Sequence, residues 1–141
     1  MLDGNLSCHM IYQDDDCIAI LDKYPIDNGH SLIITKKPYE KITDMDVDAV
    51  AKLFSKIPKI ANAIIKATNA DAFSIAQNNG KAAKQIIPHV HIHIIPRYNM
   101  TGTLWMKRKI MKDSELDIMA QKIKNCLEWS FNLSNLDCNV K

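Results

Sequence analysis

The chain has 141 residues, of which 47% are hydrophobic and 24% charged, as is typical of one globular domain with a sizeable core. Its formal net charge of only +2 argues against a nucleic-acid partner. No apolar run approaches the roughly 18 residues that a membrane span needs, and residues 1–7 lack the basic and apolar regions of a signal peptide. None of the four cysteines forms a C-x-x-C pair, so we expect reduced thiols in a cytoplasmic protein.

The N-terminal part of the chain predicts three short strands. Residues 9–13 and 17–22 are rich in strand formers and flank three consecutive aspartates, which favours a hairpin with an acidic turn. Asp27, Asn28 and Gly29 form a turn signal, and residues 31–35 are expected to form a third strand.

A long amphipathic helix is expected next, over roughly residues 47–65. The apolar residues that recur at helical spacing are Val47, Val50, Leu53, Phe54, Ile57, Ile60, Ala61, Ile64 and Ile65. Pro58 has no backbone N–H and its ring clashes with the preceding turn, so it predicts a kink or a break near residues 54–57.

The second half of the chain predicts two more strands and a second helix. Residues 72–77 and 89–95 are expected to be strands, with a polar loop over residues 78–84 between them. Residues 114–129 predict a helix whose apolar face consists of Leu116, Met119, Ile123, Cys126 and Leu127. Weak periodicity from Ser130 onward predicts a flexible tail over residues 130–141 after a single domain over residues 1–129. These elements predict an α+β fold, with an antiparallel sheet of about five strands, one long helix and a C-terminal helix.

Three histidines alternate with apolar residues in the run His89-Val90-His91-Ile92-His93. Successive side chains of a strand point to opposite faces, so the three imidazoles are expected to share one face, with their Cα atoms roughly 6.6 Å apart. The apolar residues between them can then anchor the other face in a core.

Three kinds of site are compatible with this row. A His-x-His pair is a common metal-ligand pattern, but the nearest polar neighbours are Lys84, Gln85 and Arg97, which suit an anion better, so we expect no metal and no other cofactor. An imidazole can instead attack phosphorus and form a covalent intermediate, with one ring nitrogen free and the other fixed by a hydrogen bond. The third alternative is a strand whose histidines only satisfy hydrogen bonds in the core.

At the level of longer motifs, the run from His89 to Arg97 resembles the signature of the histidine triad superfamily of nucleotide hydrolases and transferases. Further segments that fit the same pattern are Asn78-Asn79-Gly80 with Gln85, Asp14-Asp15, Leu21-Asp22 with Pro25, and the run from Gly29 to Ile34. The resemblance covers about residues 2–97 and is to bacterial and archaeal types of member, near the phosphoramidase and dinucleoside polyphosphate hydrolase branches. It implies a homodimer whose subunits join their sheets.

The resemblance implies that His91 is the nucleophile. Its Nδ1 would be held by a main-chain carbonyl while Nε2 attacks the α-phosphate of a purine nucleotide, and water would hydrolyse the resulting nucleotidyl-histidine. His89 and His93 would orient the site and assist proton transfer, and His30 would lie behind the triad. A role for His30 as a hydrogen-bonded core residue stays open.

The resemblance also assigns substrate contacts, to Asn78, Asp22, Ile20, Leu21, Gly80 and Lys84. Gln85 and Asn78, with loop amides near Gly80, would bind phosphate oxygens. Asp22 would bind the ribose hydroxyls, and Ile20 and Leu21 would line the base pocket. Asp22 as a turn residue and Asn78 as a plain loop amide are the alternatives.

Several features depart from the family pattern. Lys84 stands where relatives carry glycine, so we expect it to reshape the loop or bear backbone strain, and to bring a cation to a second or third phosphate. Ile86 replaces the hydroxyl-bearing residue of relatives near the leaving group. The segment after Arg97 does not match the end of the phosphoramidase branch, and the cysteine-containing stretch of many relatives has no counterpart before Leu2.

The sequence therefore predicts a hydrolase that cleaves a purine nucleoside 5′-phosphate from an amine or from a second nucleotide. His93 favours hydrolysis, because transferases and many phosphorylases of the family carry Gln at this position. The alternatives are a slow-turnover nucleotide-binding regulatory module, a dinucleoside polyphosphate phosphorylase and a metal-dependent hydrolase.

Overall fold

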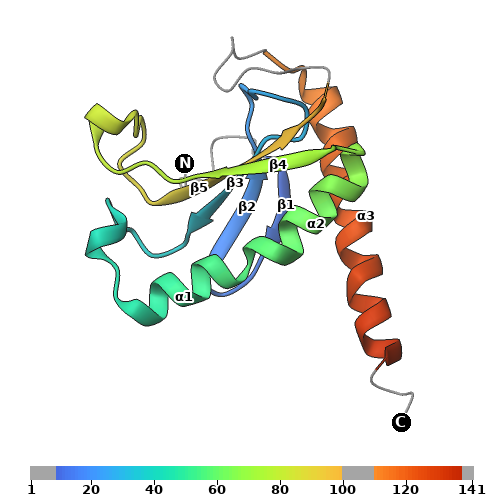
Figure 1. Cartoon of the computed structure of the whole chain (residues 1–141), viewed down its shortest axis with the longest axis horizontal. Coiled ribbons are helices and arrows are strands. Elements are labelled where there is room, and N and C mark those ends of the chain that lie inside the picture. The colour runs from blue at the N-terminus through green and yellow to red at the C-terminus, as the bar shows by residue number, and fades with distance from the viewer. Residues whose placement is uncertain (1–8, 100–109, 138–141) are drawn as a thin grey trace.

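The computed structural model describes residues 9–99 and 110–137, and its side chains up to residue 127. One five-stranded antiparallel sheet with strand order β1-β2-β3-β5-β4 forms the centre of the molecule (Figure 1). Its strands are β1 (Met10–Gln13), β2 (Cys17–Leu21), β3 (Ser31–Thr35), β4 (Ala72–Ala76) and β5 (His91–Arg97). The predicted α+β class and the five-strand sheet are confirmed.

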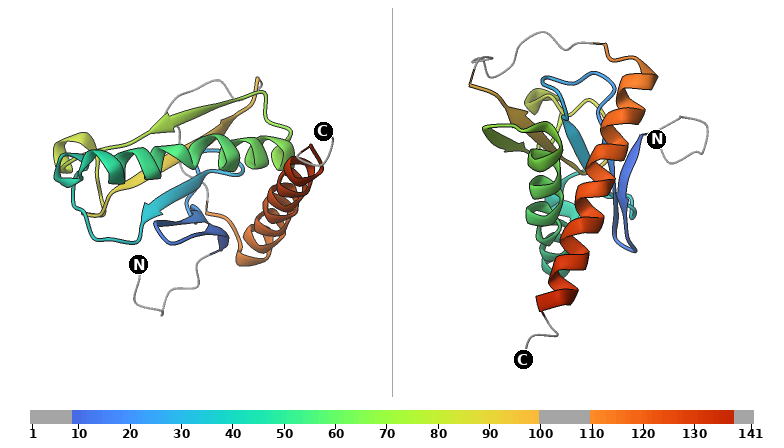
Figure 2. Two further views of the ribbon diagram at one scale, coloured as in Figure 1. Left: turned by 90° about the horizontal axis from the view of Figure 1, so that it is seen from below. Right: turned by 90° about the vertical axis from the view of Figure 1, so that its right-hand side faces the viewer.

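Three α-helices cover one face of this sheet (Figure 2). They are α1 (Val47–Ser55), α2 (Ile57–Thr68) and α3 (Asp113–Asp137), and two short 3₁₀ turns, η1 (Ile42–Asp44) and η2 (Lys81–Ala83), lie in the loops. The predicted break before Pro58 is confirmed, because α1 ends at Ser55 and Lys56 separates it from α2. Among the described residues, no helix is long and apolar enough to cross a membrane.

Three details of the helices differ from the sequence prediction. Val47 and Phe54 are 84% and 37% exposed, so they do not belong to the buried stripe of α1. Helix α3 continues through Asp137 instead of ending at Trp129, so residues 130–137 are helical, and residues 138–141, the rest of the predicted tail, lie outside the described part. Once a helix has nucleated, each further residue adds a hydrogen bond, so it can extend beyond its apolar stripe.

The turn between β1 and β2 is tied to the break between α1 and α2. The Asp14 carboxylate accepts hydrogen bonds from the backbone N–H groups of Asp16 and Cys17 at 2.8 and 2.9 Å and from the Tyr12 hydroxyl at 2.7 Å. Lys56 Nζ lies 2.9 Å from Asp14 Oδ2. Burial alone would raise the pKa of Asp14, but the hydrogen bonds from Lys56, Tyr12 and the two amides lower it well below its usual range. The predicted acidic hairpin thus forms, and it anchors the helix layer.

Strand alternation gives the sheet two different faces. Leu21, Ile33 and Ile92 belong to the large core beneath the three helices. The opposite face carries a separate cluster of Ile18, Ile20, Leu32 and Ile34, all from β2 and β3. Because Ile92 and Ile94 of β5 enter the helix-side core, His91 and His93 lie on the face opposite the helices.

Candidate active site

Register places the imidazoles of β5 beside the apolar residues of β3. Leu32 pairs with His93 and Ile34 with His91. Because Ile20 pairs in turn with Leu32, an apolar floor on β2 and β3 continues directly into the two histidines. Leu21 is not part of this floor, because it is in the helix-side core. The expectation that Ile20 and Leu21 line one pocket is therefore wrong, since neighbouring strand residues face opposite sides.

The hydrogen bond of His91 leaves one of its ring nitrogens available. Its Nδ1–H donates to the backbone carbonyl of His89 at 2.7 Å. In a neutral imidazole the second nitrogen, Nε2, then carries a lone pair. The ring is mostly buried and lies edge-on to His93, with 5.0 Å between ring centroids. This is the geometry that a nucleophilic imidazole requires.

His89 lies outside β5, which begins at His91 and not at residue 89. The backbone N–H of Val90 donates to the Tyr39 carbonyl at 2.8 Å, and this loop contact ends the regular pairing with β3. His89 Nε2 instead donates to the Thr35 carbonyl at 2.6 Å, at the end of β3. The expectation of three imidazoles on one strand face therefore holds for His91 and His93 only.

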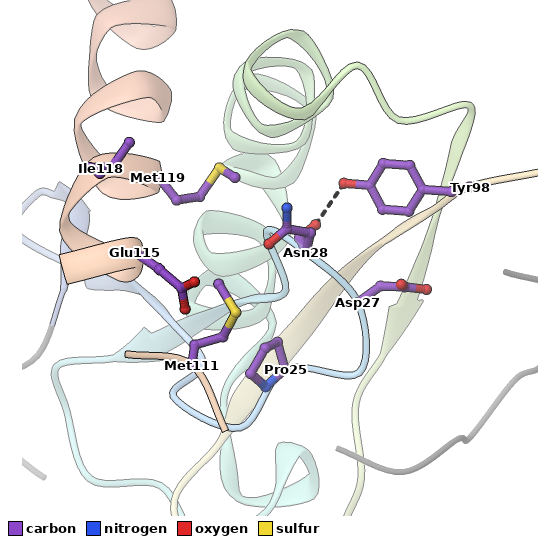
Figure 3. Close-up of a pocket in the computed structure, with 8 residues that line it drawn as sticks. All are labelled: Pro25, Asp27, Asn28, Tyr98, Met111, Glu115, Ile118 and Met119. Carbon is purple, nitrogen blue, oxygen red and sulfur yellow. Dashed lines mark hydrogen bonds between the residues drawn. The ribbon is translucent and has the colours of Figure 1, made fainter. Parts of the chain in front are cut away.

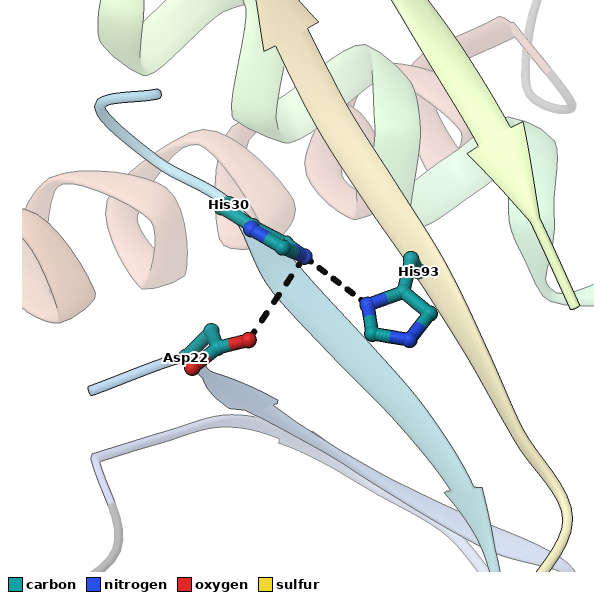
Figure 4. Close-up of side chains that lie close together, drawn as sticks. All are labelled: Asp22, His30 and His93. Atoms are coloured by element: carbon teal, nitrogen blue, oxygen red, sulfur yellow. Dashed lines mark hydrogen bonds and ion pairs between the residues drawn. The ribbon is translucent and has the colours of Figure 1, made fainter. Parts of the chain in front are cut away.

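Behind His93 lies a buried chain of polar groups (Figure 4). The backbone N–H of Ile26 donates to His30 Nδ1 at 3.0 Å, and His30 Nε2 lies 2.9 Å from His93 Nδ1. Asp22 Oδ2 lies 3.6 Å from His30 Nε2, while Asp22 Oδ1 accepts the N–H of Tyr24 at 2.9 Å. His30 is thus both completely buried and adjacent to the triad, as the resemblance implied.

The same three side chains bring possible metal ligands within 4.8 Å of one another. Tetrahedral zinc, with Zn–N bonds of about 2.0–2.1 Å, would separate two imidazole nitrogens by roughly 3.4 Å. The His30 and His93 nitrogens are 2.9 Å apart, the distance of an N–H···N hydrogen bond, and the other nitrogen of His30 accepts the Ile26 amide. The present arrangement is that of a hydrogen-bonded chain, and it would have to open to admit a metal.

The loop before β5 is held together by Gln85. Its Oε1 accepts the N–H of Gly80 at 2.6 Å, and its Nε2 donates to the carbonyl of Glu40 at 2.6 Å. The Gly80 amide is therefore hydrogen-bonded within the loop, and the expected binding of phosphate oxygens by loop amides near Gly80 stays a prediction. Asn79 supports the same loop by accepting the N–H of Ile42 at 2.8 Å.

Lys84 adopts the left-handed conformation that a glycine would favour. Its φ is 67° and its ψ 27°, so the predicted backbone strain is present, and its side chain is exposed. Ile86 is 83% exposed. Asn78 follows the end of β4 and is partly buried. These residues, with Gln85, form the border of the site on the side of β4.

A cavity of about 560 Å³ lies apart from the imidazoles, between the turn before His30 and the first part of α3 (Figure 3). Met111, Glu115 and Met119 line one side, and Tyr98 closes another by donating its hydroxyl to the Asn28 carbonyl at 2.8 Å. None of its described lining residues is a histidine. No local sequence pattern indicates this cavity, because its lining comes from segments far apart in the chain.

Comparisons with known proteins agree with this geometry. The HIT domain family matches residues 3–100. Adenylylsulfatase HINT3 of Arabidopsis thaliana is 43% identical over 125 residues, which cover 88% of this chain but only 63% of that protein. Adenosine 5′-monophosphoramidase hnt1 of Schizosaccharomyces pombe is 31% identical over 96 residues, 68% of this chain and 69% of that protein. The crystal structure of a Zn-bound histidine triad family protein from Mycobacterium smegmatis superimposes with a TM-score of 0.80 at 30% identity, covering 92% of this chain and 91% of that one. The fold, the paired imidazoles and these matches lead to one conclusion: the chain belongs to the HIT domain family.

Proposed function

We propose that the protein is a nucleotidyl hydrolase that uses His91 to cleave a purine nucleoside 5′-phosphate from a second group. The observation that carries this proposal is the Nδ1–H bond from His91 to the His89 carbonyl, which leaves the Nε2 lone pair for attack on phosphorus. In the first step the N–P bond forms and the bond from phosphorus to the leaving group breaks, with the leaving group taking the bonding pair. Water then attacks the nucleotidyl-histidine, releases the nucleoside monophosphate and restores His91.

The arrangement of the sheet suggests how such a substrate would lie. The purine and ribose would rest on the apolar floor of β2 and β3, near Ile20 and Leu32, with Asp22 beside the ribose. The α-phosphate would then lie over β5 at His91. The leaving group would extend past β5 toward Asn78 and the loop that carries Lys84, because β4 and this loop come next across the sheet.

The relatives' names support the nucleotide half of this substrate. One is named an adenylylsulfatase and another an adenosine 5′-monophosphoramidase, so an adenosine 5′-phosphoryl group is common to both names while the leaving group differs. We propose an adenosine 5′-phosphate derivative as the substrate here also, with the bond cleaved being a phosphoramidate or a phosphoanhydride.

Substitution of His91 tests the proposal. His91→Asn should abolish turnover, with a loss well beyond the ~10²–10⁴-fold that removal of a general acid or base costs, and should leave nucleotide affinity nearly unchanged. Acid quenching of the wild type with a nucleotide labelled on its α-phosphate should trap label on the protein, and the His91→Asn variant should trap none. If His91→Asn stays within tenfold of wild type while His89→Ala is inactive, the assignment of the nucleophile is wrong.

A homodimer is the second part of the proposal. Strand β4 is at the edge of the sheet, and Phe73 and Ile75 on it are 40% and 47% exposed. Edge strands with exposed apolar residues readily pair with another copy. Sedimentation should therefore show a dimer for the wild type and a monomer for Ile75→Lys, and a monomeric wild type would contradict this part.

A further inference from the structure

The cavity between α3 and the turn before His30 has the size and the lining of a small-molecule site (Figure 3). Its volume of about 560 Å³ lies within the ~300–1,000 Å³ of such sites, which are mainly apolar with a few polar groups that orient the ligand. Among the described residues, the cavity shares no lining residue with the paired imidazoles of β5. It is therefore separate from the candidate active site.

The apolar part of the lining comes mainly from α3. The buried stripe of this helix packs into the core, whereas Ile118 is 60% exposed at the border of the cavity. Met111 and Met119 complete this wall, and methionine side chains are flexible enough to adapt to different ligands. Exposed apolar side chains beside a cavity are typical of a binding surface, so the wall favours a ligand with a hydrocarbon body.

The charge of the lining is negative. Its described part contains two carboxylates, Asp27 and Glu115, and no basic side chain. Asp27 Oδ2 lies 3.7 Å from Arg97 Nη1, so a guanidinium compensates its charge. Glu115 Oε2 accepts the backbone N–H of Lys112 at 3.1 Å, and because this amide is neutral, Glu115 keeps its negative charge. A cationic group is the complement that this carboxylate would bind.

The wall opposite α3 is held in place by hydrogen bonds. The Tyr98 hydroxyl donates to the Asn28 carbonyl at 2.8 Å, and the Asp27 carbonyl accepts the backbone N–H of His30 at 3.0 Å. The turn that lines the cavity is therefore ordered before any ligand arrives. Such a preformed site lowers the cost of binding, because fewer groups have to be ordered.

We propose that this cavity binds a small organic cation, with its ammonium group at Glu115 and its hydrocarbon body against Ile118 and the two methionines. The two carboxylates would repel an anion, and a neutral hydrocarbon would remove water from Glu115 without supplying a partner. The site is additional to the proposed nucleotide site and requires neither His91 nor a nucleotide.

Calorimetric titration of the full-length protein with n-octylamine, which is protonated near neutral pH, tests the class of ligand. We expect one saturable site per chain, an affinity about 2–5-fold lower for n-octanol, which lacks the charge, and no binding of octanoate. A wild type that does not bind octylamine would overturn the proposal and would indicate that another part of the chain or a second copy closes the cavity. Equal affinities for octylamine and octanoate would also overturn it.

Two substitutions test the two parts of the site. Glu115→Gln keeps an oxygen for the Lys112 N–H but removes the charge, and should weaken octylamine binding about 2–5-fold while leaving octanol binding unchanged. Ile118→Lys adds a cation at the exposed border and should weaken octylamine binding about tenfold or more. The matched controls are Glu40→Gln and Val47→Lys, at exposed positions outside the lining. If the two cavity variants bind octylamine as well as their controls do, the proposal is wrong.

Methionine NMR and nucleotide competition determine where octylamine binds. In protein with ¹³C-labelled methionine methyl groups, the signals of Met111 and Met119 should shift on titration, while those of Met10 and Met45, which are outside the lining, should not. Adenosine 5′-monophosphate should not compete with octylamine. Competition, or shifts confined to other methionines, would place the amine elsewhere and overturn the proposal. Wild-type protein that hydrolyses no nucleotide but binds octylamine at Met111 and Met119 would refute the proposed function alone, whereas an active enzyme that binds no octylamine would refute this inference alone.

Discussion

Gly29 is the position where the fold has the least tolerance for a side chain. Its φ is +88°, and a Cβ there would lie 2.6 Å from Thr68 Cγ2 and 3.2 Å from Pro96 Cγ. Gly29→Ala should therefore cost about 1–2 kcal/mol for the left-handed backbone and a further ~1–3 kcal/mol for overpacking. A total near 3 kcal/mol is a large fraction of the ~5–15 kcal/mol that stabilises a typical domain, and should lower Tm by roughly 10 °C.

A double-mutant cycle separates the cost of the steric clash with Thr68 from the cost of the left-handed backbone at Gly29. Thr68→Ser deletes the clashing Cγ2 but keeps the hydroxyl that donates to the Ile64 carbonyl at 2.8 Å. Urea unfolding at constant m-value should show Gly29→Ala/Thr68→Ser to be at least ~1 kcal/mol more stable than the sum of the single substitutions implies. Strict additivity would show that Thr68 does not limit this position, and would refute the reasoning.

Gly29 also connects stability to the candidate active site. It precedes His30, and its carbonyl accepts the Ser31 hydroxyl at 2.8 Å. The folded fraction of Gly29→Ala should therefore have a lowered kcat, because displacement of this turn moves His30 away from His93. An unchanged kcat per folded molecule would show that His30 keeps its place despite the substitution.

Three further outcomes are expected. Thermal unfolding should show that the stability difference between wild type and Asp14→Asn is complete above about pH 5 and narrows as the pH falls. The reason is that the lowered pKa of Asp14 stabilises the fold only while its carboxylate is charged, and the unfolded chain titrates near pH 3.9. A stability difference that widens in acid would contradict this prediction. Overnight chelation should leave the rate of adenosine phosphoramidate hydrolysis unchanged, because we expect that no metal is required. Stoichiometric, tightly bound zinc in active protein would contradict this expectation. Lys84→Gly should lower kcat/KM for dinucleoside polyphosphates about 2–5-fold more than for the phosphoramidate, and this difference should shrink at high salt, because an exposed lysine stabilises a phosphate by ~0.5–1 kcal/mol. Lys66→Gln, which removes an exposed lysine on α2, is the control for net charge. Equal losses on both substrates would show that Lys84 does not interact with the phosphate charge.

Strand β5 was predictable because its two faces lie in opposite environments. Alternation alone separated Ile92 and Ile94, which are completely buried under the helices, from His91 and His93. The position of His89 was not predictable, because the start of a strand depends on its neighbours. Here β3 ends at Thr35, and the Tyr39 carbonyl takes the N–H of the residue after His89.

The loop chemistry was harder to predict than the strands. Gln85 reaches the Glu40 carbonyl, a contact between distant segments that no local pattern signals. The error at Leu21 was of another kind, because the alternation that separated the histidines from the isoleucines also forbids Ile20 and Leu21 to share a face. The extension of α3 to Asp137 reflects hydrogen bonds that a search for an apolar stripe does not detect.

The alternation in β5 also protects the protein against a particular error. If β5 shifted by one residue against β3, His91 and His93 would enter the apolar core and Ile92 and Ile94 would leave it. Such a molecule would bury polar rings without partners and would not persist as a folded species. Chains in which the candidate nucleophile is misaligned therefore unfold, and they do not accumulate as folded but inactive protein. As denaturant is added, the fraction of chains that trap nucleotide on His91 should therefore fall in step with the folded fraction, which makes the reaction itself a measure of correct strand register.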